Sequence, residues 1–209
     1  MKNNNKIFLG EFIASCFLVM VIVGSGIMAE NLTNDNAVRL LANTIATGAG
    51  LFVLITAFAN ISGAHLNPFV SLSMYLTKRI KGKELLTFIP AQILGCLLGV
   101  MLANVFFEHS IIELSTKNRD GFHIFLSEIV ATFGLIFIIF ATLKDGKTTV
   151  AACVATYISA GYWFTSSTSF ANPAVAIART FTDSFTGINY LNTPTYIFAD
   201  YWGLLLLFI

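Results

Sequence analysis

Hydrophobic residues occur in long runs that are separated by short polar connections. Five runs are long enough to cross a hydrocarbon core of roughly 30 Å at about 1.5 Å of helical rise per residue. These runs cover residues 7–28, 38–58, 85–107, 122–143 and 149–168. A sixth begins near Tyr190, is interrupted by Pro194 and continues to residue 209, a stretch of about 21 Å that is short for a span. The pattern therefore predicts an all-α membrane protein with six transmembrane helices, the last of them short or truncated.

Composition supports a lipid environment for this chain. Hydrophobic residues make up 56% of the 209 residues and charged residues 11%, which leaves too little polar surface to cover a water-soluble globule. The formal net charge is +1, so no acidic or basic excess indicates a nucleic-acid partner. No set of nucleophile, base and orienting group suggests an enzyme, and no motif indicates a cofactor. The three cysteines lack metal-ligand or redox spacing and are interpreted as free packing residues: Cys16, Cys96 and Cys153.

The basic residues of the connections alternate between the two sides of the predicted bundle. Eight fall on one side, namely Lys2, Lys6, Lys78, Arg79, Lys81, Lys83, Lys144 and Lys147, and four on the other, namely Arg39, Lys117, Arg119 and Arg179. Because the side richer in lysine and arginine faces the cytoplasm, we expect both termini to be cytoplasmic. The chain is accordingly predicted to be a multi-pass protein of the inner (plasma) membrane.

The two halves of the chain carry the same landmarks in the same order. The matching motifs are Glu11-Phe-Ile-Ala-Ser with Glu128-Ile-Val-Ala-Thr, Asn67-Pro68 with Asn172-Pro173, and Ala91-Gln-Ile-Leu-Gly with Ala199-Asp-Tyr-Trp-Gly. Because each half has an odd number of spans, the second half must cross the membrane in the opposite sense. We therefore predict a single domain, 1–209, of two inverted repeats, 7–107 and 122–209, with a functional site at the midplane.

The segments around the two Asn-Pro pairs predict half-length helices that enter the membrane and return. Each pair follows a polar stretch and precedes a helix-compatible run that is too short to span, near 70–77 and near 174–182. Irregular backbone is tolerated at membrane depth only where it lines a cavity or is buried in protein. Asn favours the N-cap of a helix and Pro its first position. In an inverted repeat the two helix starts meet, and their positive dipole ends favour polar neutral solutes over cations.

This arrangement resembles the aquaporin, or major intrinsic protein, family. The residues that carry the resemblance are Ser62-Gly63-Ala64-His65-Leu66-Asn67-Pro68 and Phe170-Ala171-Asn172-Pro173-Ala174, and the likeness covers nearly the whole chain. The resemblance implies an aquaporin-like fold and a passive channel for water and small uncharged solutes such as glycerol, without a cofactor. It also implies a homotetramer in the lipid bilayer with one pore per subunit. The pore-signature residues that it assigns are Asn67, Pro68, Phe69, Asn172, Pro173 and Ala174.

Three polar residues have expected structural roles. Glu11 and Glu128 fall inside predicted helices, where a carboxylate is costly. The resemblance implies that they accept hydrogen bonds from the re-entrant loops, and a proton relay is the alternative. His65 is expected to hold its loop by hydrogen bonding and not to bind a metal, because no second ligand stands near it at ligand spacing.

The expected selectivity filter departs from the family's pattern. Most members have an arginine directly after the second Asn-Pro-Ala, whereas this chain has Val175. The change removes five hydrogen-bond donors and a fixed charge, which predicts a wider and neutral filter. The other filter candidates, all small, are Ala160, Ser169 and, in the second span, either Thr47 by ungapped counting or Ala49 by alignment.

Two further residues are expected to modify the pore. Arg179 lies one helical turn beyond Val175 and is expected to line the outer vestibule and supply part of the missing cation barrier. Alternatively, Arg179 anchors the helix end or pairs with Asp183. Phe69 stands where the family usually has alanine, and its ring either narrows the midplane or is accommodated by shifts nearby.

The solute is less tightly defined than the channel. The run from Phe170 to Arg179 resembles a bacterial aquaporin subgroup often associated with arsenic-resistance genes. That resemblance implies neutral trivalent arsenic species, arsenite or methylarsenite, beside water and glycerol. A secondary transporter is an alternative, since inverted repeats with broken helices also occur in transporters. A shortened channel homologue with reduced activity is another, suggested by the short last span and by Phe69.

Overall fold

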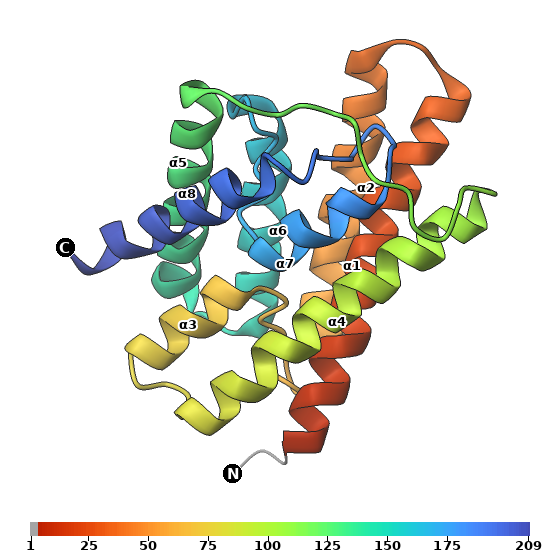
Figure 1. The fold of residues 1–209 in the computed structure, drawn as a ribbon. Helices are drawn as coiled ribbons and strands as arrows, with labels where there is room; N and C mark the ends of the chain where they lie inside the picture. Colours follow the sequence, from red (N-terminus) through yellow and green to blue (C-terminus); the bar gives the residue numbers. More distant parts are fainter. Residues whose placement is uncertain (1–3) are drawn as a thin grey trace.

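The computed structural model describes residues 4–209, which form helices and no strand. Lys2, counted above with the inner cations, lies outside these residues. Figure 1 shows the arrangement. The helices are α1 (Asn4–Leu32), α2 (Asn36–Phe58), α3 (Pro68–Leu76), α4 (Gly82–Phe106), α5 (Phe122–Thr142), α6 (Lys147–Phe164), α7 (Pro173–Ala178) and α8 (Thr193–Leu205), with 3-10 turns η1 (Arg179–Phe181) and η2 (Leu206–Phe208).

The six longer helices follow the predicted runs in order. Four of them, α1, α2, α4 and α5, are long and apolar enough to cross a membrane. Helix α6 has 18 residues and ends at Phe164, short of the predicted 168, because the backbone becomes irregular from Thr165 onward. Helix α8 has 13 residues, in keeping with the short sixth run.

The two half-helices begin at the prolines of the Asn-Pro pairs. The Asn67 side chain caps α3 by accepting a hydrogen bond from the backbone N–H of Phe69, 2.9 Å away. The Asn172 side chain caps α7 by accepting from the N–H groups of Ala174 and Val175. Proline suits the position after each cap because its missing N–H would have no partner inside the helix.

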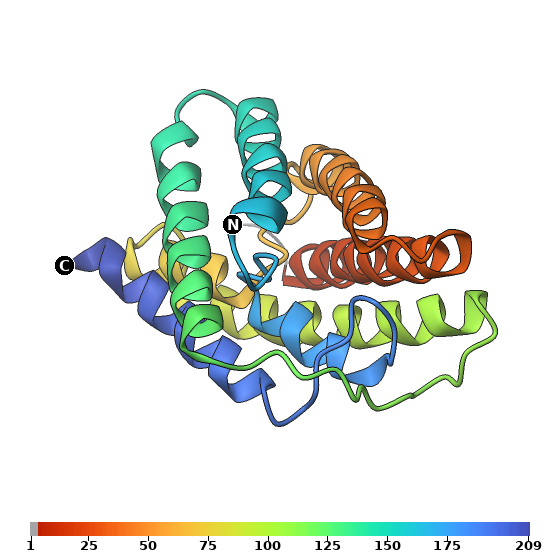
Figure 2. The ribbon, with the colours of Figure 1, turned by 90° about the horizontal axis from the view of Figure 1, so that it is seen from above.

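The two halves pair their helices in the same way. Helix α1 packs against α4 and α2, and α5 packs against α8 and α6, while α2 and α6 join the halves. Figure 2 shows α2 and α6 as neighbours, with α4, α7 and α8 along the opposite side. Gly95 lets α4 touch the α1 backbone at Phe12, and Gly203 lets α8 touch the α5 backbone at Ile129. A methyl group at either glycine would overlap that backbone, so these contacts require glycine.

Candidate solute pathway

The two asparagines of the half-helices each bond to the loop of the other half. Asn67 Nδ2 donates to the carbonyl oxygen of Ala171 at 2.6 Å, and Asn172 Nδ2 donates to that of Leu66 at 2.8 Å. Both asparagines line one cavity of about 570 Å³. Each amide nitrogen carries two hydrogens and uses one in this bond, so a second donor on each side remains for a solute.

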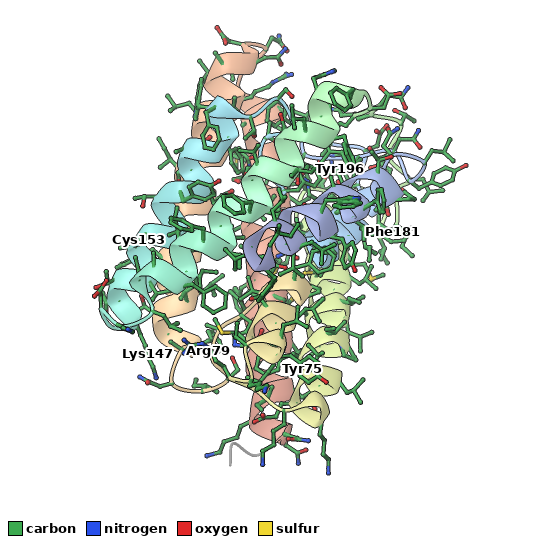
Figure 3. The ribbon with its side chains drawn as sticks, turned by 90° about the vertical axis from the view of Figure 1, so that its left-hand side faces the viewer. Tyr75, Arg79, Lys147, Cys153, Phe181 and Tyr196 are labelled. Atoms are coloured by element: carbon green, nitrogen blue, oxygen red, sulfur yellow. The ribbon has the colours of Figure 1, made fainter. Side chains whose placement is uncertain are left out.

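The cavity extends from the two asparagines toward the connection between α5 and α6. Its apolar lining comes largely from α2, α5 and α6, and its polar lining from the two re-entrant loops. Figure 3 places Arg79 and Lys147 close together in the lower half of the molecule, below Cys153 in that view. Among the described residues that line the cavity, every charged side chain is a cation, namely Arg79, Lys144, Lys147 and Arg179. Positive charge of this kind opposes the entry of cations and leaves neutral solutes unaffected.

The first re-entrant loop is held by Glu11, which is fully buried in α1. Its Oε1 accepts hydrogen bonds from the Ser62 hydroxyl at 2.6 Å and the His65 N–H at 3.1 Å. Its Oε2 accepts from the Leu66 N–H at 2.7 Å and from Gln92 Nε2 at 2.8 Å. The donors satisfy a carboxylate that burial would otherwise penalise, and they fix a backbone in which Leu66 has the left-handed φ of 53°.

The second loop is held in the same manner by Glu128, which is fully buried in α5. Its Oε1 accepts from the Phe170 N–H at 3.0 Å and its Oε2 from the Ala171 N–H at 2.7 Å. Ala171, like Leu66, directly precedes the asparagine and has a left-handed φ, of 46°. Each glutamate therefore holds the residue whose carbonyl receives the asparagine of the other half.

His65 lies in the first loop and touches residues of two helices. Its Nδ1 is 3.0 Å from the Ser71 hydroxyl, and its ring stacks on Phe88 with the ring centres 4.2 Å apart. Within residues 4–209, His, Cys, Asp and Glu side chains form no group of three or more that could hold a metal ion.

The cavity lining also includes Thr47, Tyr162, Ser169 and Val175. The Tyr162 hydroxyl donates to Thr47 Oγ1 at 3.2 Å, which connects α6 to α2. Gly161 leaves room for the Ser169 side chain, because a methyl group there would overlap it. The Ser169 hydroxyl is buried and has no hydrogen-bond partner among residues 4–209.

Two of the expected filter positions are wrong. Ala49 and Ala160 are exposed on the outside of the bundle, while Thr47 and Tyr162 face the cavity. For α6 the reason is the loop between Phe164 and Asn172, in which Thr168, Ser169 and Ala171 have positive φ. Counting residues back through an irregular loop does not preserve the helical face, so the count reached the wrong side of α6.

Arg179 is almost fully buried at the outer end of the cavity. Its guanidinium lies over the Phe170 ring, 3.5 Å from the ring centre, and its Nε donates to the carbonyl oxygen of Thr186. The alternative pairing with Asp183 is wrong, because that carboxylate accepts hydrogen bonds from the N–H and hydroxyl of Thr116. Arg179 is among the residues that line the cavity, and its role in an outer vestibule stays a prediction.

A second arginine, which the sequence did not single out, lies near the same ring. Arg119, from the connection before α5, is 5.6 Å from the centre of Phe170. Its Nε donates to the Gly187 carbonyl at 2.8 Å and its Nη2 to that of Phe185 at 2.9 Å. Burial lowers the pKa of this guanidinium from its ordinary value, and the nearby Tyr196 opposes that shift.

Phe69 does not line the cavity. Its ring packs toward α8, with its centre 6.3 Å from that of Tyr201, in an apolar groove shared with Ile197 and Phe198. Of the two alternatives for Phe69, the one in which its ring narrows the midplane is therefore wrong. Phe69 follows Pro68 in the first turn of α3, and at this position its side chain points away from the meeting point of the half-helices.

Comparison with known proteins agrees with this geometry. Residues 1–206 match the family described as major intrinsic protein. The aquaglyceroporin AqpS of Rhizobium meliloti (strain 1021) is 45% identical over 195 residues, which are 93% of this chain and 84% of that protein. Aquaporin TIP1-2 of Musa acuminata is 36% identical over 149 residues, and the match spans 68% of this chain but only 58% of the plant protein.

Solved structures show the same fold. The X-ray structure of the aquaglyceroporin from Plasmodium falciparum superposes with a TM-score of 0.78 at 21% identity, over 98% of this chain and 93% of that one. An FNT family ion channel superposes less closely, with a TM-score of 0.60 at 15% identity. The prediction of an aquaporin-like helical fold is thus confirmed.

Proposed function

The chain belongs to the major intrinsic protein family, and from that premise we propose that its cavity is a passive path for water, glycerol and neutral trivalent arsenic species. The protein is a channel and not an enzyme. The observation that carries the proposed path is the pair of hydrogen bonds from Asn67 to Ala171 and from Asn172 to Leu66. Those bonds hold both amides on the wall of one cavity. There, the remaining hydrogen of each amide can donate to a solute and compensate for the hydrogen bonds that the solute loses when it leaves water.

The outer lining supports passage of solutes that carry hydroxyl groups. Val175 adds an apolar surface where the family usually has arginine, and the amide nitrogens of Asn67 and Asn172 each keep one hydrogen for a solute. Glycerol and the neutral hydroxylated forms of trivalent arsenic match this combination of an apolar wall and a few polar contacts. The similarity to an aquaglyceroporin supports the same class of solutes.

Exclusion of cations is the second requirement on this pathway. We propose that Arg179 provides the barrier that Val175 cannot, with Arg119 on the same aromatic ring adding to the positive potential. Arg79, Lys144 and Lys147 do the same at the other end of the cavity. A cation would therefore meet unfavourable potential at both ends, whereas an uncharged solute would not.

Assembly and placement follow from the family. We propose a homotetramer in the inner membrane with both termini cytoplasmic, formed from a single domain with inverted repeats 7–107 and 122–209. The packing of α1 on α4 in the first half and of α5 on α8 in the second supports the repeat. Large apolar side chains exposed on the outside of the bundle, such as Leu9, Phe17 and Val53, supply surface for lipid or for neighbouring subunits.

Reconstitution into liposomes tests the proposal. Stopped-flow light scattering should show water and glycerol permeability above that of empty liposomes, and uptake of arsenite should exceed the same background. Asn67→Ala with Asn172→Ala, which removes both amides, should reduce all three. A Tyr75→Phe variant, altered on the exposed side of α3, is the matched control. Solute accumulation against a gradient, or counterflow, would indicate a transporter and contradict the proposal.

A further inference from the structure

Two carboxyl groups meet where α5 packs against α8. Glu128 and Asp200 are both fully buried, and their side chains are within hydrogen-bonding reach of each other. Both oxygens of Glu128 already accept hydrogen bonds from the second re-entrant loop, at Phe170 and Ala171. Two ionised carboxylates in contact, away from water, would be very costly. Their contact is therefore explained only if one of the two groups carries a proton.

The surroundings of Asp200 identify the group that carries it. Asp200 Oδ1 accepts a hydrogen bond from the Thr132 hydroxyl at 2.7 Å. Its Oδ2 is buried and receives no donor from any of residues 4–209. A buried oxygen without a donor is what a protonated carboxyl presents, because that oxygen is itself the donor. Glu128, in contrast, accepts two backbone N–H groups of the loop, which suit a carboxylate.

In the first half of the chain, an amide group occupies the position equivalent to Asp200 and donates to the buried glutamate. Gln92 Nε2 donates to Glu11 Oε2 at 2.8 Å. Gln92 stands three residues before Gly95, and Asp200 stands three residues before Gly203. Those glycines contact the residues that directly follow Glu11 and Glu128 along α1 and α5. Gln92 and Asp200 thus occupy equivalent positions, and a hydrogen-bond donor is needed at both.

We propose that Asp200 is an uncharged carboxylic acid that donates a hydrogen bond to Glu128 and thereby positions the outer re-entrant loop. Glu128 holds Phe170 and Ala171, and this stretch carries Ser169 and Asn172 into the cavity. Asp200 itself does not line the cavity, so it acts on the solute path through Glu128. The effect on permeability rests on the proposed channel function, whereas the protonation state does not.

Infrared spectroscopy and an isosteric variant test the inference. Wild-type protein in lipid at pH 7 should show the carbonyl band of a protonated carboxylic acid that Asp200→Asn lacks. Because the asparagine amide can donate to Glu128 as Gln92 does to Glu11, Asp200→Asn should keep glycerol permeability within about twofold of wild type. Asp200→Leu, which has no donor, should lower it by about tenfold.

Several outcomes would overturn the inference. A difference spectrum without the acid band shows that Asp200 is ionised, and loss of permeability in Asp200→Asn equal to that in Asp200→Leu shows that the donor is irrelevant. Gln92→Glu is the matched control in the first half, and it should add a second acid band. The infrared comparison decides the matter even if Asp200→Leu does not assemble. Absence of permeability in the wild type would instead count against the channel proposal.

Discussion

The guanidinium of Arg179 lies 3.5 Å from the centre of the Phe170 ring, although the two residues sit on opposite sides of the Asn172-Pro173 pair. Phe170 belongs to the loop and Arg179 to the turn that follows the half-helix, so their contact joins the two ends of this re-entrant segment beside the cavity. The contact places a fixed positive charge within one helical turn of Val175. A cation barrier can therefore exist although the usual filter position is apolar.

Replacing Arg179 with alanine should remove that barrier. We expect the leak of sodium ions or protons through reconstituted channels to rise by about tenfold or more, while glycerol permeability does not fall. Fluorescent indicators inside liposomes report the leak. Arg179→Lys keeps the charge without the planar group that covers Phe170, and should leak less than Arg179→Ala. An unchanged leak in Arg179→Ala would exclude a barrier role.

Restoring the common residue at the filter should narrow the solute range. Val175→Arg adds five donors and a charge to a position that lines the cavity and is almost fully buried. We expect glycerol and arsenite permeability to fall by about tenfold while water permeability is retained in larger part. Stopped-flow measurements on one preparation give the three rates. Val175→Leu, which adds volume without charge, is the control, and equal effects of both variants would show that size alone sets selectivity.

Much of the architecture follows from the sequence, because burial in lipid demands long apolar runs and Asn-Pro marks a helix start. Helices α3 and α7 begin at Pro68 and Pro173, where the capping preference predicts them. The face of α6 could not be obtained in this way. The irregular loop before Asn172 breaks the register, so Ala160 was assigned in place of Tyr162. A periodicity count within α6 itself, where Val150, Val154, Ile158 and Tyr162 recur every four residues, points to the correct face.

Contacts between segments that are distant in the sequence could not be predicted either. Arg119 comes from a solvated connection, and nothing in its neighbours indicates that it reaches Phe170. In the sequence, Asp200 stands out only as part of a repeated motif. Its relation to Glu128 depends on the close approach of α8 to α5 at Gly203, which is a property of the packed fold.

Cysteine accessibility should distinguish the two faces of α6. Ile158 lines the cavity and Ala160 is exposed on the outside of the bundle. A mercurial or a small methanethiosulfonate reagent should block water and glycerol flow in Ile158→Cys by about fivefold or more and leave Ala160→Cys unaffected, because only the first thiol narrows the pathway. None of the three native cysteines is among the described residues that line the cavity, so the wild type is the baseline. Block of Ala160→Cys alone would reverse the assignment.

Phe69→Ala should affect stability and not conduction. The ring packs on Tyr201 beside α8 and lies outside the cavity lining, so its removal leaves the path unchanged and the contact between α3 and α8 weakened. We expect glycerol permeability per channel within about twofold of wild type and a loss of roughly 2 kcal/mol in stability, less than for a fully buried phenylalanine. Thermal unfolding in detergent and stopped-flow rates normalised to protein measure the two quantities.

If the ring contact is the cause, Tyr201→Ala should lower the unfolding temperature similarly. The double variant should then lose less stability than the sum of the two single losses. A several-fold rise in glycerol permeability for Phe69→Ala would mean that the ring restricts the pore after all.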